Sequence, residues 1–143
     1  MLTNVTFRHP AKFVGDQEDG GVLAVRGAQW FAALLKGVPR LELDEDLCQE
    51  DWGVVCFARR NQTKFWIGVS AWDSEGAWLA HFHHGSVAWL QWFSSAGKGE
   101  LRRLLADVHD VLASEPAITE IAWHEERDMS KPKPAGFPTP VEG

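Results

Sequence analysis

Cysteine, tyrosine and long apolar runs are scarce or missing in this chain, which has two cysteines and no tyrosine. No stretch approaches the roughly 18 consecutive apolar residues that mark a membrane-spanning helix, so the sequence predicts no membrane insertion. The N-terminal segment also lacks a basic start followed by an apolar core, the pattern of an export signal. We therefore expect a cytoplasmic protein in which Cys48 and Cys56 are free thiols.

Positive charge is the second shortage. Lysine and arginine number 14 against 20 acidic residues, which gives a formal net charge of −6. Only Arg59–Arg60 and Arg102–Arg103 are adjacent basic pairs, and both are expected to be ordinary surface residues. A negative field with no basic cluster repels phosphate backbones, so a nucleic-acid partner is not expected.

Motifs for nucleophilic or phosphate chemistry are absent as well. The sequence holds no Gly-x-Ser-x-Gly, and Gly97–Lys98–Gly99 lacks the remainder of a phosphate-binding loop. Cys56 alternates with apolar neighbours in a predicted strand, as a small buried hydrophobe would. The sequence therefore favours a non-catalytic protein without a cofactor.

Histidine supplies the one alternative that leads to an enzyme. His81 and His83 lie two residues apart in a predicted strand, so both imidazoles point to the same side and could bind a transition metal. A zinc site needs three or four ligands, and a third would have to come from Asp73, Glu75 or His124. A small metal-dependent hydrolase that uses His81 and His83 thus stays open as an alternative.

Periodicity and turn residues predict an α+β fold. Apolar residues recur at helical spacing over 25–36 and 98–114, and 86–93 has weaker features of a short helix. Predicted strands cover 2–8, 52–60, 64–72, 77–84 and 118–125. The gaps at 61–63 and 73–76 are too short for crossover helices, so the three middle strands form an antiparallel meander.

The architecture that follows is an antiparallel sheet, centred on this three-stranded meander, with two main helices packed on one face. Within the middle strand, Phe65, Ile67 and Val69 fall on the core face, whereas Trp66 and Trp72 fall on the opposite, half-covered face. Residues 1–129 are predicted to form a single domain. The proline-rich residues 130–143 are predicted to be an extended, poorly ordered tail.

The strongest indication of a ligand is the acidic segment, residues 41–51, which carries six acidic side chains and leads into the tryptophan-rich part of the chain. Such a run is as typical of a solvated loop that keeps a protein soluble as of a recognition surface. Eight tryptophans exceed the needs of one small core, and tryptophan beside carboxylates is typical of interfaces steered by charge. The predicted partner-binding residues are Asp44, Glu45, Asp46, Glu50, Asp51 and Trp52, and the predicted partner is a basic protein.

The runs LELDEDLCQEDWGVVCFARR and KFWIGVSAWDSEGAW, in a small acidic chain rich in tryptophan, resemble bacterial immunity proteins that neutralise polymorphic or contact-delivered toxins. The resemblance is one of general character and transfers no functional residue. It implies cytoplasmic residence, tight binding of one cognate toxin domain and no cofactor. A subunit that self-associates through exposed tryptophan is a further hypothesis.

Overall fold

The structure, a computed structural model, describes residues 1–9, 20–73, 76–85, 95–131 and 136–140 of the 143-residue chain. The predicted short helix at 86–93 lies outside these residues. The described elements are, in chain order, β1 (Leu2–Arg8), α1 (Gly20–Leu35), β2 (Glu42–Glu50), β3 (Gly53–Arg60), β4 (Thr63–Ala71), β5 (Ala77–His84), α2 (Ser95–Ser114), β6 (Thr119–Glu125) and the single-turn helix η2 (Glu126–Asp128).

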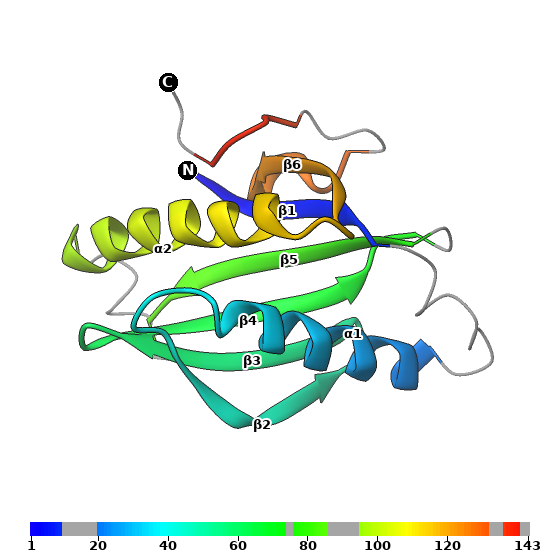
Figure 1. The fold of residues 1–143 in the computed structure, drawn as a ribbon, viewed down its shortest axis with the longest axis horizontal. Coiled ribbons are helices and arrows are strands. Elements are labelled where there is room, and N and C mark those ends of the chain that lie inside the picture. Colours follow the sequence, from blue (N-terminus) through cyan, green and yellow to red (C-terminus); the bar gives the residue numbers. More distant parts are fainter. Residues whose placement is uncertain (10–19, 74–75, 86–94, 132–135, 141–143) are drawn as a thin grey trace.

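The strands form one six-stranded sheet in the order β2-β3-β4-β5-β1-β6, and every neighbouring pair is antiparallel (Figure 1). The α+β class predicted from the sequence is therefore confirmed. The predicted three-stranded meander of β3, β4 and β5 is only part of the sheet. The meander continues into β2, and β1 and β6 complete the six strands. The acidic segment was read as a solvated stretch, yet it pairs with β3 as a strand, with Leu43 and Leu47 packed against the core.

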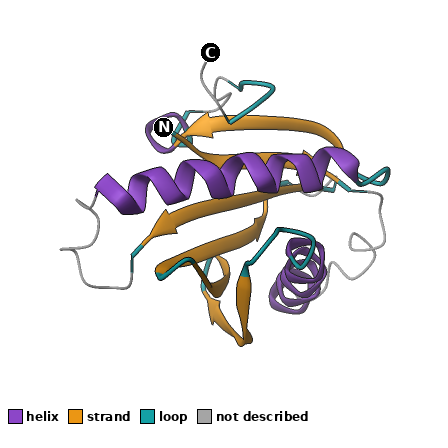
Figure 2. Ribbon diagram, turned by 60° about the vertical axis from the view of Figure 1, so that its left-hand side comes forward, coloured by secondary structure: helices purple, strands orange, loops and turns teal. Residues whose placement is uncertain are grey.

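Both helices lie on the same face of the sheet (Figures 1 and 2). Helix α1 packs mainly over β3 and β4, and α2 packs over β5. The core between the helices and the sheet follows the predicted alternation in β4, since Phe65, Ile67 and Val69 are fully buried. We call the opposite face of the sheet, which neither helix contacts, the outer face.

One buried charged cluster corrects the sequence analysis. Arg60 is 2% exposed, and its Nε donates to Glu100 Oε1 at 2.8 Å. Arg60 also pairs with Asp107, while Arg103 Nη2 donates to the second oxygen of Glu100 at 2.8 Å. Burial alone would raise the pKa of Glu100, but the hydrogen bonds and charges of Arg103 and Arg60 lower it below its ordinary value. Arg60 therefore joins β3 to α2 instead of lying on the surface as predicted.

Part of the predicted tail makes defined contacts. Phe137 forms an isolated antiparallel bridge with Trp123 of β6, in which each backbone N–H donates to the other residue's carbonyl oxygen at 2.8 Å. This pairing covers a portion of the β6 edge of the sheet. Among the described residues, no helix is long and apolar enough to cross a membrane.

Candidate protein-binding surface

Strand β2 forms the end of the sheet opposite β6, and no described strand pairs with its outer edge. The pairing of β2 with β3 is interrupted: Leu43 lies opposite Ala58 and Leu47 opposite Cys56, so four positions of β2 span two positions of β3. Such a bulge pushes the extra residues out of the pleat and re-aims their side chains. As a result, Asp44, Glu45 and Asp46 are three consecutive exposed carboxylates.

The carboxylates of the acidic segment take part in none of the ion pairs found within 4.0 Å among the described residues. Six acids elsewhere in the fold are ion-paired, namely Asp73, Glu100, Asp107, Glu120, Glu125 and Asp128, whereas Asp110, Glu115 and Glu126 take part in none of these pairs. Glu50 and Asp51, at the other end of β2, are also exposed. The acidic segment thus presents charge that the described part of the protein leaves uncompensated.

Trp52 occupies the two-residue turn that joins β2 to β3, next to Asp51. Its indole folds over the outer face and meets the ring of His81 edge-on, with the ring centroids 4.9 Å apart. The side chain remains 47% exposed. Trp52 therefore fixes the acidic turn to the sheet while offering roughly half of its surface to a partner.

The imidazoles of His81 and His83 lie on the outer face, as the strand alternation predicts. The ring of His83 stacks on Trp66 at 4.2 Å, and His81 meets Trp66 edge-on at 5.1 Å. Gly68 makes room for His81, because a Cβ atom at Gly68 would lie 1.7 Å from His81 Nε2. His81 Nε2 is buried and has no hydrogen-bond partner among the residues that the structure describes.

This packing favours the neutral form of both imidazoles. Burial, together with the neighbouring charge of His83, lowers the pKa of His81 from 6.5 to about 4. Burial also lowers the pKa of His83. Across the described residues, no group of three histidine, cysteine, aspartate or glutamate side chains is arranged to hold a metal ion. The pair thus acts as aromatic packing for Trp52 and Trp66.

The two cysteines are free thiols, as predicted. Cys48 is exposed on β2 and Cys56 is buried in the core. Burial, with a smaller contribution from Cys48, raises the pKa of Cys56 to about 11. A thiol that stays protonated at neutral pH is a poor nucleophile, so Cys56 is a core residue.

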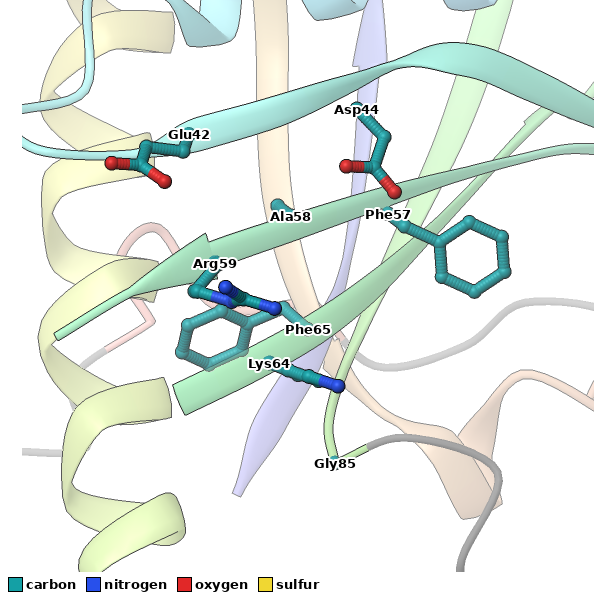
Figure 3. Close-up of a pocket in the computed structure, with 8 residues that line it drawn as sticks. All are labelled: Glu42, Asp44, Phe57, Ala58, Arg59, Lys64, Phe65 and Gly85. Carbon is teal, nitrogen blue, oxygen red and sulfur yellow. The ribbon is translucent and has the colours of Figure 1, made fainter. Parts of the chain in front are cut away.

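A pocket of about 310 Å³ adjoins the acidic segment where β2, β3 and β4 run side by side (Figure 3). Its charged and aromatic lining comes from Glu42, Asp44, Phe57, Arg59 and Lys64. Of these five residues, only Asp44 was predicted to bind a partner, and Arg59 was expected to be an ordinary surface residue. Strand alternation contained the missing signal, since Phe57 and Arg59 flank the core residue Ala58 and must point to the outer face. The pairing of Glu42 with Arg59 could not be known until β2 was recognised as a strand.

Comparison of the chain with protein-family models, with curated proteins and with solved structures finds no match.

Proposed function

We propose that this protein is a non-catalytic binding protein that captures a basic protein partner through the acidic segment and Trp52. The observation that carries the proposal is the bulged outer strand β2, where consecutive carboxylates project without an ion pair to any other described residue. An unpaired surface charge has no ion pair to break when an opposite charge approaches. It also steers that approach over about 10 Å at ordinary ionic strength. Trp52 adds exposed aromatic area at the end of the same strand.

Charge on an outer strand has a second explanation. Edge strands frequently carry charged residues and bulges because both discourage pairing with the edges of other molecules. That explanation accounts for Asp44, Glu45 and Asp46 in the bulge. It does not account for Asp51 and the half-exposed Trp52, which lie in the turn beyond the last pair of the ladder, Glu50 with Gly53. Because Asp51 and Trp52 lie beyond the last paired residues, their exposure supports a role in binding a partner.

Within this class, we propose an immunity protein that resides in the cytoplasm and neutralises a cognate bacterial toxin domain. Carboxylates placed on a strand can occupy a basic cleft where a toxin would otherwise hold the phosphates of its substrate. Such an inhibitor works by steric and electrostatic occlusion, so it needs neither a cofactor nor reactive groups of its own. The low pKa of His81 and the high pKa of Cys56 agree with this, because neither side chain is prepared for proton transfer or attack at neutral pH.

The proposal is tested by affinity capture with the full-length tagged chain and mass spectrometry of what it retains. The test variant is Glu45→Gln/Asp51→Asn. The matched control is Asp110→Asn/Glu115→Gln, which changes the net charge equally but lies at the far end of α2. We expect a basic protein to be retained by the wild type and the control and to be lost from the test variant.

Protection of cells completes this test. Co-expression of the chain should suppress the toxicity of the captured protein, and the test variant should protect less well than the control. Capture of an acidic protein, or equal retention by all three chains, would overturn the role of the acidic segment. Retention of a basic protein that harms no cell would leave a binding protein but reject the immunity assignment.

Self-association is the second candidate, and exposed aromatic side chains support it. Trp52, Phe57 and Trp72 are 47%, 36% and 39% exposed, respectively, and Phe57 and Trp52 lie on the outer face or over it. Sedimentation velocity across a hundredfold range of protein concentration separates the two candidates. A sedimentation coefficient that rises with concentration, and that Trp52→Ala returns to the monomer value, would favour self-association.

A further inference from the structure

The pocket between β2, β3 and β4 combines features that the acidic segment alone does not have. Glu42 and Asp44 come from β2, Phe57 and Arg59 from β3, and Lys64 from the start of β4 (Figure 3). With about 310 Å³, the pocket is large enough for one long side chain but small for a whole organic cofactor. Its apolar contribution includes Phe57, whose ring is 36% exposed.

The charges in the pocket are neighbours without being ion-paired. Glu42 lies opposite Arg59 in the β2–β3 register, and Arg59 lies opposite Lys64 in the β3–β4 register. None of the ion pairs formed within 4.0 Å by the described residues involves these side chains. Glu42 lies directly across the ladder from Arg59, whereas Asp44 lies in the bulge and has no cross-strand partner in the register, so Asp44 is the carboxylate most accessible to a ligand.

Asp44 and Phe57 together define the chemistry of that ligand. Figure 3 shows the carboxylate of Asp44 pointing from β2 over β3, with the ring of Phe57 on one side and the side chains of Arg59 and Lys64 on the other. A cation held over an aromatic face gains about 0.5–1 kcal/mol at an exposed site. Arginine suits such a place better than lysine, because its planar guanidinium can stack on the ring while it donates two hydrogen bonds to a carboxylate.

We propose that this pocket seats one arginine side chain of the protein partner, with the guanidinium between the Asp44 carboxylate and the Phe57 ring. The inference rests on the proposed function, since it takes the partner to be a basic protein. It adds a specific anchoring point to a surface that would otherwise attract basic partners only diffusely.

The pocket is tested directly with a small probe, Nα-acetyl-L-arginine methylamide, titrated into the isotope-labelled full-length chain and followed by NMR. The uncharged analogue Nα-acetyl-L-citrulline methylamide has the same length and serves as the probe control. We expect saturable shifts confined to residues 42–44, 57–59 and 64, and weaker binding of the citrulline probe by about tenfold, as a charge-assisted bidentate pair predicts.

Variants locate the binding to the pocket. Asp44→Asn and Phe57→Ala should each weaken binding of the arginine probe severalfold. Asp46→Asn is the matched control, because it removes the same charge from the same strand without lining the pocket, and it should change the affinity less than twofold. All three side chains are exposed, and unchanged amide shifts away from β2 and β3 will show that each variant remains folded.

Equal binding of the two probes, equal losses in Asp44→Asn and Asp46→Asn, or no saturable shifts would each overturn the arginine site. These results are separable from a failure of the proposed function. A basic partner that binds through Glu45 and Asp51 but tolerates Phe57→Ala rejects only the pocket. A pocket that binds the arginine probe in a chain that captures no basic protein rejects only the function.

Discussion

Replacing His81 by leucine should make the free energy of unfolding less sensitive to acid. The wild type should lose more stability than the variant when the pH is lowered. In the folded state His81 stays neutral down to a pKa of about 4, whereas in the unfolded chain its pKa returns to 6.5. Between these two pH values the unfolded state binds more protons than the folded state. The free energy of unfolding therefore falls as the pH falls through this window, and the loss is complete below about pH 4.

The magnitude follows from the size of the shift. One pKa unit corresponds to about 1.4 kcal/mol, and integration of the linkage from neutral pH down to pH 5 gives about 2 kcal/mol for His81. The ring is partly exposed, and solvent screening reduces this contribution. We expect the measured contribution of His81 at pH 5 to be about 1 to 2 kcal/mol.

The assay is urea denaturation of the wild type and of His81→Leu at pH 8 and at pH 5. The leucine alters the packing against Trp52 and Trp66, but that effect is the same at both pH values. The change in the free energy of unfolding from pH 8 to pH 5 is therefore compared between the wild type and the variant, and the difference is the contribution of His81 protonation. If the wild type and the variant lose the same stability between pH 8 and pH 5, burial does not hold His81 in its neutral form in the folded state, and this explanation is refuted.

Two further substitutions test the packing on either side of the sheet. Gly68→Ala should cost about 1–3 kcal/mol, because the new methyl overlaps His81 Nε2. Gly99→Ala, in α2, should be neutral or stabilising in the same urea assay, because its new methyl would lie 4.0 Å from Arg103 Nη1. Equal effects of the two alanines would contradict the close approach at Gly68. Arg60→Met should cost about 3 kcal/mol, because it removes a partner from the buried Glu100 carboxylate, and the double variant Arg60→Met/Glu100→Leu should recover much of that loss in urea denaturation. If Arg60→Met lowers the free energy of unfolding by less than about 1 kcal/mol, Glu100 does not depend on Arg60 for its stability in the core.

The elements that the sequence predicted well are those in which one periodic pattern dominates. In β4, strict alternation identified Phe65, Ile67 and Val69 as core, and in α2 the leucine stripe identified the buried face. Both helices and the α+β class followed from such patterns, because the apolar positions alone determine which face is buried.

Strand β2 was not predicted because charged residues surround the two leucines of the acidic segment that pack against the core. Leu43 and Leu47 lie four residues apart and so share one side of a strand, but Glu45 between them is charged and exposed, which interrupts the apolar alternation where β2 bulges away from β3. Arg60 was misassigned for a related reason: it was judged by its charge, although it is neutralised by Glu100 across a contact between β3 and α2 that no local pattern encodes. The arginine pocket was missed because it depends on the register of three strands.

The most direct test of the central claim is the association rate of the captured partner, measured by stopped flow over a series of salt concentrations. With the wild-type chain, the rate should fall steeply as salt rises, because the acidic segment steers the encounter. With Glu45→Gln/Asp51→Asn, the rate at low salt should be about tenfold lower and its dependence on salt shallower, at unchanged thermal stability. Association rates that are the same for both chains at every salt concentration would contradict the account.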